Sequence, residues 1–207
     1  MNRRFVLAVV LAAVLAGAAA ALIATRRMQP PSALERMTLL DAPRPLPALS
    51  LIDHSGRKFA RDSLRGHWTL LFFGFTHCPD VCPATLAILA QARHMLLDLL
   101  PADQPRIVLV SVDPRRDTPA ALGRYVGHFD PEFLGVTGGA DALAQLTREL
   151  GVVVLTGPTA DDGSYTVDHT AAIFVIDPSA ALAAVSSSPH EAGAIARDYR
   201  TIVARRS

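Results

Sequence analysis

The chain has 207 residues, half of them apolar, and a formal net charge of +1. Its 20 basic residues are interleaved with 19 acidic ones, so the sequence has no basic face of the kind that binds nucleic acid. Composition therefore gives no indication of a nucleic-acid partner. The residues left after an apolar N-terminus are enough for one compact domain.

An apolar segment spans residues 5–24 and follows Arg3 and Arg4. At about 1.5 Å per residue it is long enough to cross a hydrocarbon core of about 30 Å, and the arginines favour a cytoplasmic amino terminus. We therefore expect residues 1–27 to form a single-pass signal anchor in the inner membrane, with the rest in the periplasm. A cleaved signal peptide is the alternative, because small residues near position 18 resemble a cleavage site.

Residues 28–47 contain five prolines and few periodic apolar positions. This composition is typical of an extended linker, and we expect a tether here. The globular domain is then expected to occupy residues 48–207.

Apolar runs alternate with helical patterns along the rest of the chain, an order that indicates an α/β sheet. The expected strands lie at residues 49–53, 58–60, 68–75, 106–113, 134–137, 152–155, 171–176 and 182–185. The expected helices lie at residues 84–100, 118–128, 140–150 and 188–203. This order predicts a thioredoxin-like fold, in which helices flank a central mixed sheet.

The only two cysteines, Cys78 and Cys82, follow the buried strand at residues 68–75. Three residues separate them, whereas two separate the cysteines of a thioredoxin-type redox motif. Pro83 suits the first position of a helix, so Cys82 is expected at the helix start, where free N–H groups favour thiolate over thiol. In an exported domain such a pair favours Cu(I) or zinc over hard cations, and it can also cycle as a redox disulfide.

Two thiolates leave a metal site incomplete, and among seven histidines His169 is the strongest candidate for a third ligand. It precedes the strand at residues 171–176, which in a thioredoxin-like fold borders the cysteine loop. A hydrogen-bonded histidine at a strand start is the alternative interpretation. His77 ranks second, because neighbouring side chains at a strand end point to opposite faces. Solvated positions are expected for the remaining five histidines: His54, His67, His94, His128 and His190.

Four stretches of the chain together resemble the Sco (SenC) family of copper chaperones for cytochrome c oxidase assembly. They are FGFTHCPDVCP at residues 73–83, SVDP with RDTP at residues 111–119, LGVTG at residues 134–138, and VDHT at residues 167–170. The resemblance implies that Cys78, Cys82 and His169 hold one copper ion, as Cu(I) or Cu(II). It also agrees with a single N-terminal membrane anchor.

By the same resemblance, the expected function is delivery of copper to the CuA site of cytochrome c oxidase subunit II, with a separate protein as copper donor. Asp80 and Asp113 are expected beside the ligands or facing the partner, although each can equally be a turn-forming residue next to proline. The chain departs from the family at residues 177–180, where a glycine is expected in the hairpin turn.

Two other functions fit parts of the same motif. A thiol–disulfide reductase that keeps the CuA cysteines reduced would use Cys78 and Cys82 but would not need His169. A peroxidase is the third hypothesis, because residues 81–85 partly resemble the peroxidatic-cysteine segment of peroxiredoxins. Neither Cys78 nor His169 has a role in that reaction.

Overall fold

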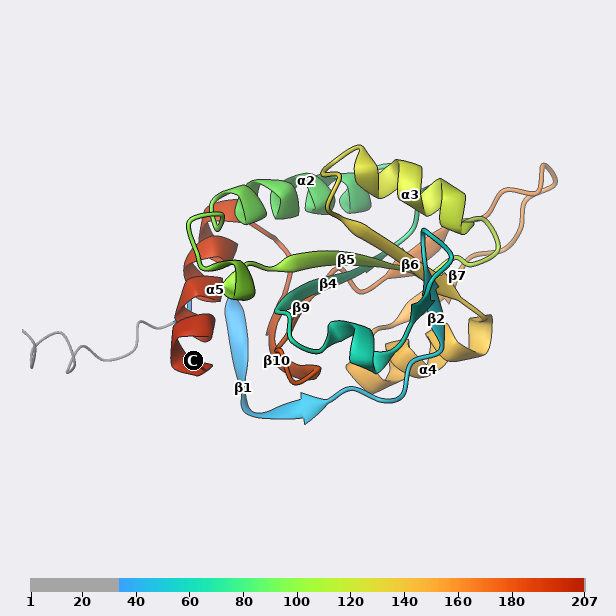
Figure 1. Ribbon diagram of the computed structural model, residues 1–207. Coiled ribbons are helices and arrows are strands. Elements are labelled where there is room, and N and C mark those ends of the chain that lie inside the picture. The colour runs from blue at the N-terminus through green and yellow to red at the C-terminus, as the bar shows by residue number, and fades with distance from the viewer. Residues whose placement is uncertain (1–33, 207) are drawn as a thin grey trace, which may run out of the picture. The chain divides into compact units, whose positions relative to one another are not determined.

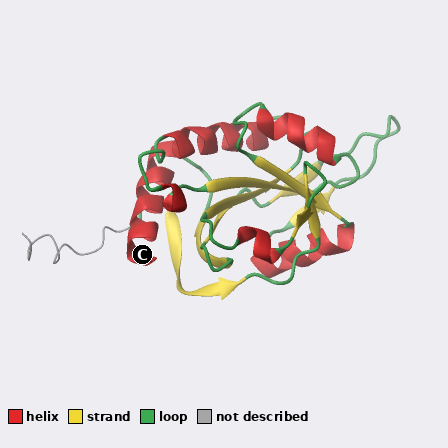
Figure 2. Ribbon diagram, viewed as in Figure 1, coloured by secondary structure: helices red, strands yellow, loops and turns green. Residues whose placement is uncertain are grey.

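The computed structural model describes residues 34–206, which form an α/β fold around a central mixed sheet (Figures 1 and 2). The segment at residues 5–24, expected to cross a membrane, lies outside this range. Within residues 34–206, no helix has both the length and the apolar character needed to cross a bilayer.

Ten strands and four α-helices make up the described fold. The strands are β1 (Met37–Pro45), β2 (Leu51–Asp53), β3 (Lys58–Phe59), β4 (Thr69–Gly74), β5 (Arg106–Ser111), β6 (Leu134–Gly138), β7 (Val154–Thr156), β8 (Val167–His169), β9 (Ile173–Ile176) and β10 (Ala181–Ser186). The helices are α2 (Val81–His94), α3 (Pro119–Gly127), α4 (Ala140–Leu150) and α5 (Ala192–Arg206), with short 3-10 helices η1 (Arg61–Leu64) and η2 (Pro101–Asp103).

Eight strands form one sheet in the order β1-β10-β9-β4-β5-β6-β2-β3. Strand β5 runs parallel to both β4 and β6, whereas β9 pairs with β4 in the antiparallel sense. Strands β7 and β8 form a separate antiparallel pair. The mixed central sheet expected from the sequence is therefore confirmed.

Two apolar cores lie on opposite faces of this sheet, and the alternating side chains of β4 feed both of them. Leu70 and Phe72 pack with residues of α2, α3 and α5, while Leu71 and Phe73 pack with residues of α4. Figure 1 shows α2 and α3 on one side of the sheet and α4 on the other. Strand β4 is fully buried, which explains its central apolar run at residues 70–73.

Helix α2 begins at Val81, earlier than expected, and ends at His94 rather than near residue 100. Pro83 is thus the third helical residue, where its missing N–H is still one of the four that have no partner inside the helix. Cys82 consequently lies within the first turn. The expected start of α3 is confirmed, because Thr118 caps the helix by accepting the N–H of Ala121 over 3.2 Å.

Part of the tether expected at residues 28–47 is strand β1, which pairs with β10 at the edge of the sheet. Its start is held by α5, because the buried Asp198 carboxylate accepts the backbone N–H groups of Glu35, Arg36 and Met37, each over 2.8 Å. The prolines of this segment fit an edge strand, where one side of the backbone needs no partner. The folded region therefore begins before residue 48.

The turn between β9 and β10 is built without the expected glycine. Ala180 takes the left-handed conformation instead, with φ of 63°. The Asp177 carboxylate supports the turn by accepting from the backbone N–H and hydroxyl of Ser179 and from the N–H of Ala181. An aspartate side chain thus stabilises a turn that costs an alanine roughly 1 kcal/mol of backbone strain.

Weakening the Asp198 contact by mutation is predicted to cause a measurable loss of stability. Asp198→Asn keeps the side-chain size but replaces one acceptor oxygen by a donor facing N–H groups. We expect the free energy of unfolding of the full chain in detergent micelles to fall by about 3 kcal/mol in urea titrations. The control is Glu35→Gln, which disturbs only the exposed pair with Arg197 and should cost much less. Equal losses for the two variants would refute the role given to Asp198.

Candidate metal centre

Two segments far apart in the sequence meet beyond the carboxyl end of β4. Cys78 lies in the loop after β4, Cys82 in the first turn of α2, and His169 at the end of β8. Cys82 Sγ is 3.3 Å from His169 Nε2, and the backbone N–H of Cys82 donates to Cys78 Sγ over 3.4 Å. Both cysteines are free thiols. The structure thus gathers the three residues selected from the sequence.

The Nε2 atom of the His169 imidazole carries a lone pair that is available to a metal ion. Its Nδ1 lies 3.2 Å from the carbonyl oxygen of Thr170, which can only accept, so Nδ1 carries the hydrogen. Burial lowers the pKa of His169 below its ordinary value, so the ring is neutral at pH 7. The rings of Phe72 and Phe75 pack edge-on to it at centroid distances of 5.9 and 6.0 Å. A metal ligand needs this tautomer and a fixed orientation.

Cys82 is completely buried, with 0% of its surface exposed. Burial raises the pKa of its thiol far above the ordinary value, and neighbouring Cys78 and Asp117 raise it further. The expectation that the helix start makes Cys82 a thiolate is therefore wrong for the metal-free protein, because desolvation outweighs the helix dipole. The Cys82 S–H is instead a donor facing Nε2 of His169.

Gly74, the last residue of β4, leaves the space that the Cys82 sulfur occupies. A Cβ at this position would stand 3.1 Å from Cys82 Sγ, 3.0 Å from a methyl group of Leu109 and 3.1 Å from the ring of Phe72. These separations are shorter than the optimal contact between such atoms. Any larger residue here would have to push Cys82, Leu109 or Phe72 aside by a few tenths of an ångström, so glycine suits the close approach of α2 to β4.

A cavity of about 500 Å³ lies beside the thiols. Residues 77–81 of the cysteine loop and residues 165–169 of the β8 segment line it, together with Phe75 and Ala171. Within residues 34–206, no three His, Cys, Asp or Glu side chains already stand in an arrangement that could hold one ion. Ligation by Cys78, Cys82 and His169 together therefore requires a rearrangement of side chains around the existing contact between Cys82 and His169.

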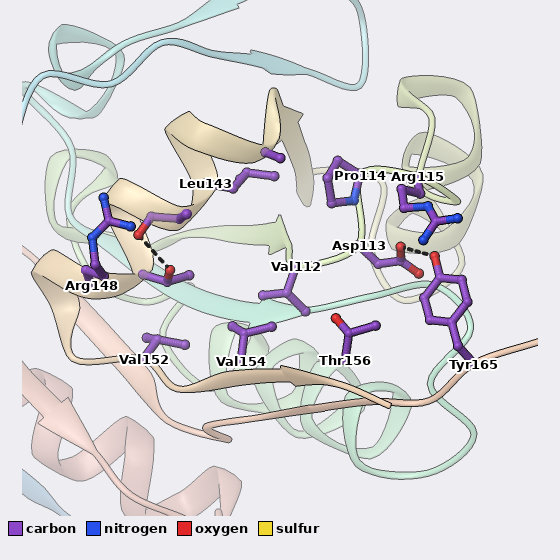
Figure 3. A pocket seen from close by; sticks show the side chains of 13 residues that line it. Val112, Asp113, Pro114, Arg115, Leu143, Arg148, Val152, Val154, Thr156 and Tyr165 are labelled. Atoms are coloured by element: carbon purple, nitrogen blue, oxygen red, sulfur yellow. Dashed lines mark hydrogen bonds between the residues drawn. The ribbon is translucent and has the colours of Figure 1, made fainter. Parts of the chain in front are cut away.

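Asp113 lies beside the centre but does not face solvent, since only 3% of it is exposed. Its carboxylate accepts from the Tyr165 hydroxyl over 2.6 Å, as Figure 3 shows, and from the Arg116 guanidinium. Arg116 also donates to the carbonyl oxygen of Tyr165 over 3.2 Å and stacks on its ring at 3.8 Å. Asp113 and Arg116 therefore fix the loop between β7 and β8, which leads directly to His169.

Asp80 and His77 occupy the exposed side of the centre. Asp80 caps α2 through its backbone, because its carbonyl accepts the N–H of Ala84 over 3.2 Å, while its side chain makes no capping bond. Both residues line the cavity beside the thiols. His77 Nδ1 lies 3.0 Å from the hydroxyl of Thr76, whereas His169 contacts Cys82 directly. Of the two candidates for a third ligand, the geometry favours His169.

Asp117 is a buried carboxylate whose role was not predicted from the sequence. It accepts from the backbone N–H of Thr76 over 3.2 Å and from the hydroxyls of Thr76 and Ser111 over 2.6 Å. The Ser111 hydroxyl in turn accepts the N–H of Asp113. This network ties the start of the cysteine loop to the turn after β5. The signal was the cluster of polar residues at 111–118, directly after a buried strand.

Two of the five histidines expected in solvated positions are in fact bonded inside the fold. His54 Nδ1 accepts the N–H of Gly135 over 3.1 Å. His190 Nε2 lies 3.0 Å from the carbonyl oxygen of Ala171, and burial lowers the pKa of His190. The expectation is wrong for these two because their partners come from distant parts of the chain.

The chain is similar to known proteins over most of the described residues. The family model described as SCO1/SenC matches residues 41–204. The chain is 47% identical over 131 residues to the mitochondrial protein SCO2 homolog of Bos taurus, a match that covers 62% of this chain and 48% of that protein. The chain spans about half the length of the first curated relatives it matches.

Solved structures match a larger share of this chain and of their own chains. Arabidopsis thaliana ScoI with copper bound is 30% identical, with a TM-score of 0.71, covering 78% of this chain and 98% of that one. Bradyrhizobium japonicum ScoI with copper bound is 33% identical, with a TM-score of 0.67, covering 75% and 98% respectively. The likeness therefore extends over nearly the whole of those folded domains.

Replacing Asp117 should loosen the cysteine loop. In Asp117→Asn, the amide can accept fewer of the three bonds from Thr76 and Ser111, so we expect faster hydrogen–deuterium exchange over residues 75–82 and faster alkylation of the buried Cys82 thiol. The control is Asp62→Asn, which alters only an exposed pair with Arg65. Unchanged exchange and alkylation in Asp117→Asn would contradict the positioning role.

Proposed function

The chain belongs to the SCO1/SenC family, and from this membership and the geometry of the centre we propose that it is a copper chaperone. It binds one copper ion through Cys78, Cys82 and His169 and delivers it to the CuA site of cytochrome c oxidase subunit II during oxidase assembly. The observation that carries the proposal is the 3.3 Å contact between Cys82 Sγ and His169 Nε2, with a second sulfur on the same loop.

The chemistry of the donor set suits copper. Thiolate and imidazole are ligands of copper, and soft sulfur favours Cu(I). The two similar structures with copper bound support the same ion. On binding, both thiols lose their protons and ligate as thiolates, so copper replaces hydrogen at the sulfur of Cys82. Transfer then requires ligand exchange alone, with no net electron transfer.

The different exposures of the two cysteine ligands indicate which of them meets an exchange partner first. Cys82 is buried behind the cavity, whereas Cys78 lines it and is partly exposed. An incoming donor protein or the CuA acceptor therefore reaches Cys78 first. The exposed Asp80 at the same opening is placed to meet such a partner. In this proposal residues 1–27 anchor the chain in the inner membrane and the copper site works in the periplasm.

Thiol–disulfide exchange is the second candidate, because both cysteines are free and adjacent across the first turn of α2. It would keep the CuA cysteines reduced, with Cys78 and Cys82 oxidised to a disulfide as the acceptor disulfide gains two electrons. A peroxidase is disfavoured, because such a reaction needs an accessible thiolate and Cys82 is a buried thiol of raised pKa.

Copper titration tests the ligand set. The full chain in detergent micelles should bind one Cu(I) in competition with a chromophoric chelator. Cys78→Ala, Cys82→Ala and His169→Ala should each weaken binding at least about tenfold, which corresponds to about 1.4 kcal/mol for a lost ligand. His77→Ala, an exposed histidine in the same loop, is the matched control and should bind like the unaltered chain. If His169→Ala bound copper with unchanged affinity, the three-ligand site would be wrong.

Oxidase assembly separates copper delivery from thiol reduction. His169→Ala removes one copper ligand but leaves both thiols, so we expect cells that depend on this variant to lose CuA-containing oxidase, measured by the CuA absorption and by oxidase activity. Immunoblotting must show equal amounts of the variant and the unaltered chain. Normal oxidase content in this variant would instead favour the reductase function.

A further inference from the structure

The outer edge of β7 carries backbone groups that have no hydrogen-bond partner within residues 34–206. Just outside the two strands, the C=O of Val153 accepts the N–H of Thr170, and the N–H of Gly157 donates to the C=O of Thr166. Because bonding alternates along an antiparallel strand, the N–H and C=O groups of Val154 and Thr156 point away from β8. No hydrogen bond to these groups is formed by the described residues 34–206. Strand β7 is thus an open edge, the kind of edge to which another strand can be added.

An apolar cavity of about 440 Å³ lies alongside this edge (Figure 3). Leu143 lines it from α4, and Val152 and Val154 line it from the segment that forms β7. Val112 lies between these two sides, as Figure 3 shows. We call the open edge of β7 together with this cavity the edge groove. Its size and lining suit an apolar side chain.

A cation stands near each end of the edge groove. Figure 3 shows Arg148 at one end and Arg115 at the other. Both side chains are exposed, and in residues 34–206 neither has a carboxylate within ion-pair distance. Asp113 also lines the cavity, but both of its oxygens are already bonded, to Arg116 and Tyr165. The charge that the groove presents to a ligand is therefore positive.

We propose that the edge groove binds an extended segment of a partner protein, which adds as a strand to β7. The N–H and C=O groups of Val154 and Thr156 bond to the backbone of that segment, as in other cases of strand addition. An apolar side chain of the segment enters the cavity, and acidic side chains on either side of it pair with Arg115 and Arg148.

The edge groove lies next to the metal centre. Val154 is the direct cross-strand neighbour of His169, and Tyr165 lines both cavities. A strand added to β7 would lie two strand spacings from β8, which is roughly 10 Å. If the proposed copper transfer is correct, a partner docked here is held within reach of the ligands. The docking itself requires neither copper nor the thiols.

The probe is the pentapeptide acetyl-Glu-Thr-Val-Thr-Glu-amide carrying a fluorophore, which places valine and both glutamates on one face of an extended strand. We expect saturable binding to the copper-free full chain in lipid nanodiscs, measured by fluorescence anisotropy. Bound peptide should slow hydrogen–deuterium exchange over residues 153–157. A peptide with every backbone nitrogen methylated should bind at least about tenfold more weakly, because strand addition needs its N–H groups.

Two sets of variants test the groove itself. Thr156→Pro removes one outward N–H but no bond to β8, and should abolish binding, whereas Thr156→Val should preserve it. Arg115→Glu and Arg148→Glu should weaken binding of the glutamate peptide and favour its lysine analogue. Arg124→Glu, an exposed change on α3, is the charge control and should have no effect.

Four outcomes would overturn the proposal. They are absence of saturable binding, binding that protects a segment other than residues 153–157, equal binding by Thr156→Pro and Thr156→Val, and concentration-dependent dimers of the chain that protect β7. The last would identify a second copy as the occupant. Because His169→Ala should bind the peptide normally, failure of docking and failure of copper binding are separately observable.

Discussion

The contact between the Cys82 thiol and the His169 imidazole is the constraint on which the rest of the centre depends. It joins two segments that lie 87 positions apart. The local sequence of either segment does not explain why they meet. Both are fixed from the turn after β5. Asp117 bonds to Thr76 at the start of the cysteine loop, while Asp113 bonds to Tyr165 ahead of β8. One short turn therefore positions both halves of the site.

Elements with a strong local pattern could be predicted from the sequence. Strand β4 contains an apolar run at residues 70–73, and α3 and α4 have clear sequence signals at their ends: Thr118 with Pro119, and Gly151. Strand β1 could not be predicted in this way, because its residues include Pro43 and Pro45 and its only support is tertiary. It is a strand because β10 and Asp198 pair with its backbone.

The two candidate cysteine ligands were found from the sequence because they are its only cysteines and lie at an expected helix start, whereas the choice of His169 rested on the resemblance to the Sco (SenC) family. Their supports were not found, because a bond such as that from Tyr165 to Asp113 depends on how distant loops pack. The pKa of Cys82 was wrongly predicted for the same reason. Its place at a helix start is local information, but its complete burial in the apolar core is not.

The hydrogen bonds from residues 35–37 to Asp198 determine when strand β1 can form during synthesis. Among residues 34–206, strand β1 lies at the edge of the sheet with β10 as its one neighbour, and its first residues are held by a carboxylate at position 198. On the ribosome, this early segment must therefore wait until almost all of the described chain has emerged. The centre built around β4 and β5 can gather earlier, so closure of the sheet edge at β1 is a late step of folding.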